Sequence, residues 1–97
     1  MQTFVFRLLP PRPDFAMTMT ESEQAVMGEH IAYWQPQIEA GRMVAFGPVM
    51  EPDGVWGLAV FEAESEEAAR ELAADDPSVV AGVNSFALGA MPQPTTR

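Results

Sequence analysis

Residues 42–63 read RMVAFGPVMEPDGVWGLAVFEA, and this stretch decides the fold because it predicts two adjacent strands joined by a tight turn. Apolar residues dominate both Arg42–Met50 and Val55–Ala63, although Gly47-Pro48 interrupts the first strand near its end. Between the strands, Glu51-Pro52-Asp53-Gly54 has the proline, aspartate and glycine that are typical of hairpin turns. We therefore expect a β-hairpin in the middle of the chain.

A helix is predicted before this hairpin. Thr20 and Glu23 have the spacing of a capping box at its start, and Gly41 is a natural stop at its end. Between them, apolar residues repeat at helical spacing, namely Met27, Ile31, Trp34 and Ile38. Pro36 lies inside this pattern, so we expect the helix to kink or locally break near Ala32 and Tyr33.

A second helix is predicted after the hairpin. Ser65 is a good cap, and two glutamates follow it in the first turn, where the helix dipole favours negative charge. This helix should extend to about Ala74. Asp76-Pro77 then opens a further short turn, because aspartate caps helices well and proline suits the first helical position.

The two ends of the chain supply the outer strands of the pattern, Thr3–Leu9 and Val83–Met91. The element order is therefore β-α-β-β-α-β, an α+β arrangement with a four-stranded antiparallel sheet and both helices on one face. We expect a single domain over residues 1–92 and a flexible C-terminal tail over residues 93–97.

Alternation along the strands predicts a sheet that is apolar on both faces. One set of positions contains Phe4, Phe6, Leu8, Val44, Phe46, Trp56, Leu58, Val60, Phe86 and Leu88. The opposite set contains Val5, Leu9, Met43, Ala45, Val49, Ala59, Phe61, Val83, Ala87 and Met91. The helices can cover only one face, and monomers rarely expose such a patch. We therefore expect a symmetric homodimer that packs sheet against sheet.

Composition excludes several classes of function. The 97 residues include 14 acids, five arginines, no lysine and no cysteine, with a net charge of −9. This charge has the wrong sign for binding nucleic acid, and a single histidine cannot form a multi-histidine metal site. The longest apolar run, Val55–Phe61, is far shorter than a membrane helix. With no cysteine and no export signal, a cytoplasmic location is expected.

His30 is the one side chain that ordinarily titrates near neutral pH. It lies about 70° from the centre of the apolar stripe, at the edge of the buried helix face, at roughly 100° per residue. It could be a boundary histidine bonded to a backbone carbonyl or an acid–base group that works with a nearby carboxylate. Asp76 is a candidate partner because it follows the second helix, although an aspartate before proline could simply cap a helix.

Other side chains could contact a ligand. Tyr33, Trp34 and Trp56 could line a pocket for a flat molecule, or simply belong to the core. Arg7 and Arg42, both on predicted strands, could attract an anionic substrate or lie paired at the surface. The scattered glycines form no phosphate-binding loop, and no serine has the context of a hydrolase nucleophile.

Two ordered sets of motifs resemble the YciI-like (YCII-related) family. The first contains Thr20-Glu21, Met27-Gly28-Glu29-His30-Ile31-Ala32-Tyr33-Trp34, Gly41-Arg42 and Phe46-Gly47-Pro48-Val49. The second contains Gly57-Leu58-Ala59-Val60, Ser65-Glu66-Glu67-Ala68, Asp75-Asp76-Pro77 and Ala81-Gly82-Val83. Together they cover roughly residues 3–92. The resemblance implies a ferredoxin-like fold that pairs as a dimeric α+β barrel, in agreement with the two apolar sheet faces.

The resemblance also implies a catalytic pair. In that family, a histidine on the first helix and the aspartate of the Asp-Pro pair form the proposed dyad, and they correspond to His30 and Asp76. The implied chemistry is acid–base elimination or isomerisation of a small, often ring-containing metabolite without a cofactor. From the residues themselves, we expect Tyr33, Trp34 and Arg7 to bind the substrate. The alternative is a non-catalytic dimer that binds a small molecule or another protein.

Overall fold

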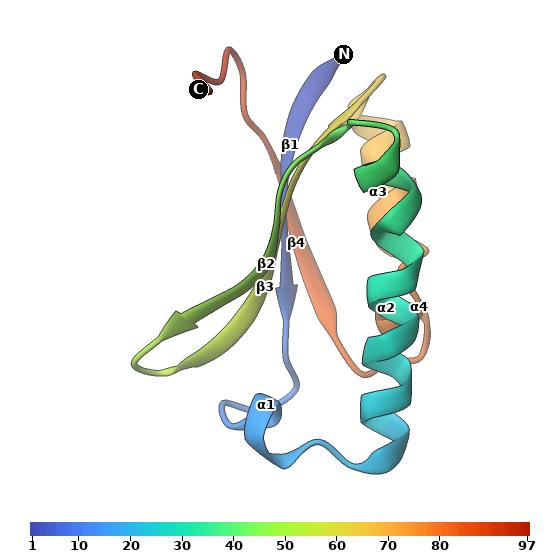
Figure 1. The fold of residues 1–97 in the computed structure, drawn as a ribbon, viewed down its shortest axis with the longest axis vertical. Helices are drawn as coiled ribbons and strands as arrows, with labels where there is room; N and C mark the ends of the chain where they lie inside the picture. The colour runs from blue at the N-terminus through green and yellow to red at the C-terminus, as the bar shows by residue number, and fades with distance from the viewer.

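The computed structural model describes residues 1–97 and has the predicted β-α-β-β-α-β order with two further short helices (Figure 1). The four strands are β1 (Gln2–Leu9), β2 (Met43–Glu51), β3 (Gly54–Ala63) and β4 (Ser85–Ala90). The four helices are α1 (Phe15–Thr18), α2 (Glu21–Glu39), α3 (Glu66–Ala74) and α4 (Pro77–Val80). The sequence predicts the turn that forms α4 but not α1, whose residues follow a proline-rich stretch.

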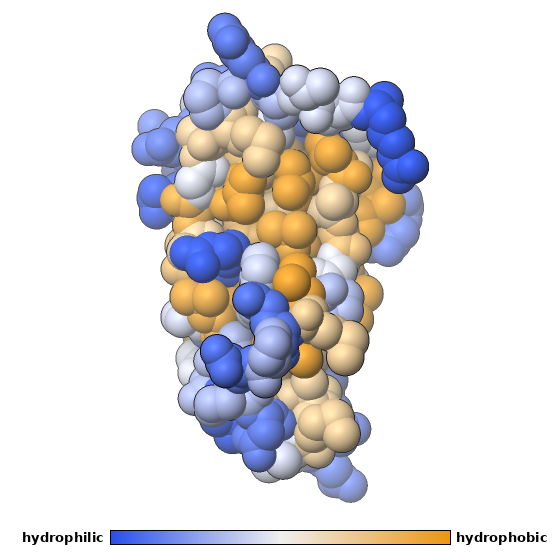
Figure 2. Space-filling view, turned by 90° about the vertical axis from the view of Figure 1, so that its left-hand side faces the viewer, coloured by the Kyte–Doolittle hydropathy of each residue, from blue (hydrophilic) through white to orange (hydrophobic).

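The strands form one antiparallel sheet in the order β2-β3-β1-β4, which is the ferredoxin-like arrangement. Helices α2, α3 and α4 lie together on one side of this sheet, and its other side carries no helix (Figure 1). The side without helices shows a broad apolar patch (Figure 2). The predicted fold class and the prediction of a one-sided sheet are therefore confirmed.

The prediction of which β3 residues share a face with Phe4 and Phe6 is wrong. In the observed register Phe4 pairs with Phe61, and Phe6 pairs with Ala59. Paired residues share a face, so Ala59 and Phe61 join the core. Strand alternation then separates these residues from Trp56, Leu58 and Val60, which the sequence pattern had grouped with Phe4 and Phe6.

A register shift in β2, between Met43 and Ala45, corrects two further assignments. The shift leaves Val44 half exposed, whereas Met43 packs against the core. A bulge of this kind inserts one extra residue into a strand, so simple alternation misassigns the positions on one side of it. Both faces of the sheet are nevertheless apolar.

The core lies between the sheet and the helices. Trp34 is fully buried, with its indole centroid 5.1 Å from the ring of Phe6 and 5.3 Å from that of Phe61. Alanines of α3 complete this layer, since Ala69 and Ala73 are fully buried against the sheet side. Small residues on α3 allow that helix to approach the strands closely.

Helix α2 begins as predicted, with Thr20 and Glu23 forming both hydrogen bonds of a capping box. Gly41 follows its end with a φ of 75°, a conformation that favours glycine. The predicted break near Ala32 does not occur, because α2 is continuous from Glu21 to Glu39. Pro36 lies within the last turn of α2. Proline has no backbone N–H and removes one helical hydrogen bond, but few helical residues follow this position.

The turn between β2 and β3 requires a glycine at position 54. Its φ is 148°, and a Cβ at this position would lie 2.8 Å from the backbone oxygen of Pro13. The hairpin turn therefore packs directly against the segment that leads into α1. Residues 91–97 follow β4 without helix or strand, and none of the helices is long and apolar enough to cross a membrane.

Candidate active site

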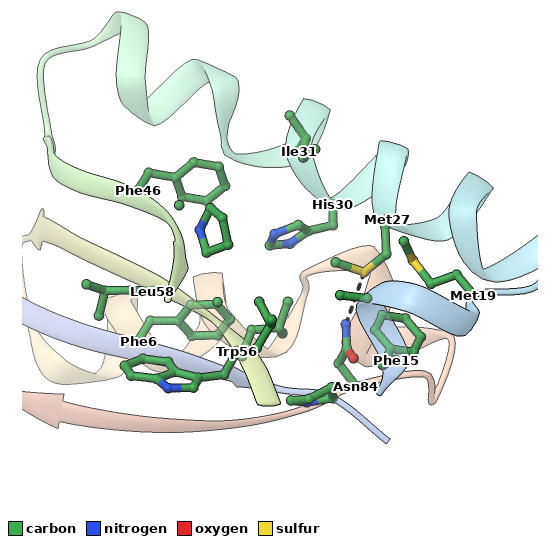
Figure 3. A pocket seen from close by; sticks show the side chains of 17 residues that line it. Phe6, Phe15, Met19, Met27, His30, Ile31, Phe46, Trp56, Leu58 and Asn84 are labelled. Atoms are coloured by element: carbon green, nitrogen blue, oxygen red, sulfur yellow. Dashed lines mark hydrogen bonds between the residues drawn. The ribbon is translucent and has the colours of Figure 1, made fainter. Parts of the chain in front are cut away.

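His30 lies in the middle of α2 and points from that helix toward an internal pocket (Figure 3). Only 7% of the residue is exposed, which is more burial than its predicted position at the edge of the helix face suggests. Its ring packs against Phe46 of β2, with the two ring centroids 5.7 Å apart. The imidazole is thus held between the helix and the hairpin.

Asp76 is fully buried at the start of α4, and both of its carboxylate oxygens are engaged. Oδ1 accepts hydrogen bonds from the backbone N–H and the hydroxyl of Ser78, each 2.8 Å long. Oδ2 accepts one from Nδ1 of His30 at 2.5 Å and one from Nε1 of Trp34 at 2.7 Å. Asp76 therefore caps α4 and also contacts the imidazole.

The environment keeps the Asp76 carboxylate negative. Burial by itself raises the pKa of an aspartate, but here hydrogen bonds from His30, Trp34 and Ser78 outweigh it. The net effect lowers the pKa of Asp76 below the ordinary value of 3.8. A negative carboxylate accepts hydrogen bonds without donating one, so Nδ1 of His30 must carry the proton in this contact.

This contact fixes the tautomer of the neutral imidazole. Since Nδ1 holds the proton, Nε2 carries a free lone pair and can accept a proton. His30 lines the pocket, whereas Asp76 lies outside it, so the carboxylate occupies the edge of the ring away from the pocket. The geometry is that of an imidazole oriented by a buried carboxylate.

The pocket beside His30 has a volume of about 290 Å³ and is almost wholly apolar. Its walls come from β1, β2, β3, α2 and the segment around α1 (Figure 3). The principal apolar residues are Phe6, Leu8, Phe15, Met19, Met27, Ile31, Phe46, Val55, Trp56 and Leu58. Apart from the Trp56 indole, which donates to Glu51, the polar side chains are those of His30 and Asn84.

Helix α1 closes one end of the pocket with Phe15, and Arg12 holds this segment in place. The Arg12 guanidinium donates two hydrogen bonds, of 2.8 and 2.9 Å, to the carboxylate of Glu23 at the start of α2. It also bonds Thr18 and lies 5.1 Å from the centroid of the Phe15 ring. The pair lowers the pKa of Glu23 to about 2.

Three residues predicted to bind substrate do not line this pocket. Trp34 is buried in the core and reaches the site only through Asp76. The Tyr33 hydroxyl donates to the backbone oxygen of Leu72 at 2.8 Å, and burial, with Asp75 and Asp76 nearby, raises its pKa to about 12. Arg7 is exposed, and its side chain points away from the buried side chains of its neighbours Phe6 and Leu8.

No sequence pattern indicates Asn84, Phe15 or Met27 as pocket residues. Asn84 falls inside the predicted strand Val83–Met91, whereas β4 begins only at Ser85. Met27 was placed in the apolar stripe of the helix, which gives no sign of a cavity beside it. No group of three or more histidine, aspartate or glutamate side chains is arranged to hold a metal ion.

The chain belongs to the YCII-related domain family, whose model matches residues 3–87. The structure is similar to 5-chloro-2-hydroxyhydroquinone dehydrochlorinase (TftG) from Burkholderia phenoliruptrix AC1100, solved in complex with 2,5-dihydroxybenzoquinone. That similarity has a TM-score of 0.65 and 18% identity, over 89% of this chain and 90% of TftG.

A second similar structure is SnoaB, a cofactor-independent oxygenase from Streptomyces nogalater. The TM-score is 0.52 with 17% identity, over 97% of this chain and 93% of SnoaB. Both neighbours belong to the dimeric α+β barrel superfamily, and this chain shares its ferredoxin-like protomer fold. A search of curated protein sequences finds no match.

Proposed function

We propose that this protein transfers a proton on a small, largely apolar molecule, with His30 as the acid–base group and Asp76 as its orienting partner. The observation that carries the proposal is the 2.5 Å contact between His30 Nδ1 and Asp76 Oδ2 at the wall of an apolar pocket. A surface pair of this kind would be exposed to water and could not select a substrate.

The proposed chemistry begins when Nε2 of His30 removes a proton from a carbon of the substrate. In an elimination, the electron pair of the C–H bond forms a double bond, and the leaving group departs with its own bonding pair. In an isomerisation, the imidazolium returns the proton to a different carbon. The Asp76 carboxylate stabilises the imidazolium in either case, and such catalysis contributes roughly 10²- to 10⁴-fold.

Neither route requires a metal, nucleotide or flavin. The names of the two structural neighbours support reactions of this kind on this fold, since TftG is a dehydrochlorinase and SnoaB is a cofactor-independent oxygenase. We further propose that the protein acts in the cytoplasm as a homodimer joined through the open face of its sheet. Figure 2 supports the dimer because that face is broadly apolar.

The alternative proposal is a binding module that holds a small molecule without changing it. The composition of the pocket favours this possibility, because only His30 and Asn84 offer polar groups beyond the Trp56 indole. A catalyst of elimination often needs a further group to assist the departure of the leaving group. The two proposals differ in whether His30 exchanges a proton with bound ligand.

Proton exchange in D₂O separates these proposals. We would incubate the protein with small cyclic ketones and hydroxylated rings and follow loss of ring C–H signals by NMR. Wild type should accelerate exchange for at least one compound, and His30→Gln should abolish most of that acceleration. Asp76→Asn should reduce the rate at least tenfold, because asparagine can cap α4 but cannot hold the same imidazole tautomer.

Glu29→Gln is the matched control, since it removes an exposed carboxylate next to His30 in sequence without touching the pocket. This variant should exchange at the wild-type rate. An unchanged rate in His30→Gln would remove the histidine from the mechanism. Binding of the same compounds without exchange in wild type would support the binding module.

A further inference from the structure

Phe15 is the one buried apolar residue that lies outside the hydrophobic core. Nine of the buried apolar residues form the core between the sheet and the helices, and Phe15, which is 5% exposed, is the remaining one. It lines the pocket beside His30, on the opposite side of the pocket from Phe46 (Figure 3). Phe15 is therefore a wall of the pocket and not a part of the core.

Phe15 belongs to a short segment that the sheet does not hold. Residues 10–19 connect β1 to α2, and their backbone-to-backbone hydrogen bonds stay within the segment, such as that from the Phe15 N–H to the Arg12 oxygen at 3.2 Å. The Arg12 guanidinium lies 5.1 Å from the centroid of the Phe15 ring and binds Glu23 of α2. Side-chain contacts therefore hold the phenyl ring at the end of the pocket.

Two other aromatic walls of the pocket belong to the core. The rings of Phe6 and Phe46 lie 5.1 and 6.3 Å from that of Trp34, as measured between centroids. A change at either position would also alter the packing of Trp34, which binds Asp76. Phe15 is absent from this cluster, so the size of the residue at position 15 can change the length of the pocket and leave the core intact.

The volume of the pocket sets a scale for its ligand. A dry apolar cavity of about 150 Å³ binds benzene. The pocket beside His30 has a volume of about 290 Å³, and no charged side chain other than the imidazole lines it. It therefore suits an uncharged molecule of about two fused rings.

From these observations we infer that Phe15 determines the upper size limit of the ligand. Its phenyl ring ends the pocket at α1, so the site accepts apolar molecules of up to about two fused rings and excludes longer ones. This inference deepens the proposed function and rests on it for the nature of the ligand as a substrate. It assigns to α1 the selection of the ligand by length.

Naphthalene and phenanthrene are suitable probes because both are flat, uncharged and fluorescent, and they differ by one fused ring. Their affinities for wild type and Phe15→Ala would be measured by fluorescence titration. Wild type should bind naphthalene more tightly than phenanthrene, although the larger molecule has more apolar surface to bury. Phe15→Ala should raise the phenanthrene-to-naphthalene affinity ratio about tenfold or more, because the third ring then occupies the space that the phenyl ring leaves.

Met17→Ala is the matched control, since Met17 also lies on α1 but is 87% exposed and does not line the pocket. This variant should keep the wild-type ratio. Phe15→Leu removes less volume and keeps an apolar side chain in place, so it should raise the ratio by a smaller factor even where Phe15→Ala fails to fold. An unchanged ratio in both Phe15 variants would overturn the inference, as would an equal rise in Met17→Ala.

The failure of the inference and that of the proposed function are distinguishable. A ratio that rises in Phe15→Ala, with no proton exchange by wild type on any ring compound, would uphold size selection by Phe15 and reject catalysis. Proton exchange that depends on His30, with the same ratio in wild type and both Phe15 variants, would do the reverse.

Discussion

Asp76 uses each of its carboxylate oxygens for a different part of the molecule. Oδ1 satisfies the first backbone donor of α4 together with the Ser78 hydroxyl, and Oδ2 binds His30 and Trp34. A helix cap and a partner for histidine are therefore not exclusive roles. One residue fixes the start of α4 and the orientation of the imidazole at the same time.

Protonation of Asp76 should destabilise the protein in acid. Its pKa is below 3.8 in the folded chain, so the unfolded chain binds the proton more readily. The stabilisation is complete well above pH 4 and is lost as the pH falls through the folded pKa. Urea unfolding at pH 7, 5, 4 and 3 should show wild-type stability decreasing below about pH 4, with a shallower decrease in Asp76→Asn.

The Glu23 carboxylate also contributes to stability in a way that depends on acid pH. A variant of Glu23 is therefore the matched comparison for this experiment. Its pKa of about 2 lies below the ordinary 4.5, so its contribution is also lost as the pH falls toward 2. Glu23→Gln should likewise flatten the pH dependence, but it should leave the His30 contact unchanged. An Asp76→Asn profile parallel to that of wild type would contradict the pKa shift of Asp76.

At the scale of the elements, local signals were predictable and contacts between elements were not. The caps at Thr20 and Ser65 and the stop at Gly41 all depend on neighbouring residues, and each occurs as predicted. The register of β3 depends on its pairing with β1, where Phe4 lies beside Phe61, and on the hairpin turn, which pairs Glu51 with Gly54; alternation within each strand contains neither. The assignment of Trp56, Leu58 and Val60 to the wrong face follows from that difference.

The candidate active site shows the same contrast between local signals, which were predictable, and contacts between elements, which were not. His30 and Asp76 could be singled out by residue type and by family resemblance, although they are 46 residues apart. Trp34 belongs to the same helix, but its indole turns toward Asp76 and the core, which helical spacing alone cannot decide. Asn84 could not be found because an asparagine before a strand has no distinctive pattern.

Replacing Pro36 should stabilise α2. Proline in a helix interior costs about 3 kcal/mol relative to alanine, and the stiffer unfolded chain offsets up to about 1 kcal/mol of this. Because Pro36 is exposed and lies near the end of α2, Pro36→Ala should raise the free energy of unfolding by about 1–2 kcal/mol. Thermal unfolding would measure the change. Gln35→Ala is the control, because Gln35 is also exposed but already has a backbone N–H.

A lower melting temperature in Pro36→Ala than in Gln35→Ala would contradict this expectation. It would mean that the proline ring stabilises the folded protein through a contact that the continuous helix does not explain. The measurement therefore also tests why a sequence expected to break α2 forms a helix from Glu21 to Glu39.

At the scale of the whole molecule, the pocket and the open sheet face lie on opposite sides of the sheet. The pocket lies between the sheet and α1–α2, whereas Val5 and Val60, which pair on the open face, do not line it. A partner that covers the open face would therefore leave His30 and Asp76 in place. The charge of −9 on each chain opposes pairing, so any dimer must rely on apolar contact and should strengthen with added salt.

Sedimentation tests this arrangement directly. Wild type at micromolar concentration should have about twice the chain mass of 10.6 kDa. Val60→Asp should yield folded monomers, because it places a carboxylate in the middle of the apolar face, opposite Val5. Val80→Asp is the matched control, since Val80 is 71% exposed on α4 and away from that face, and this variant should remain dimeric. A wild-type protein that sediments as a monomer at high salt would reject the sheet-to-sheet dimer and would leave the apolar patch of Figure 2 without a partner.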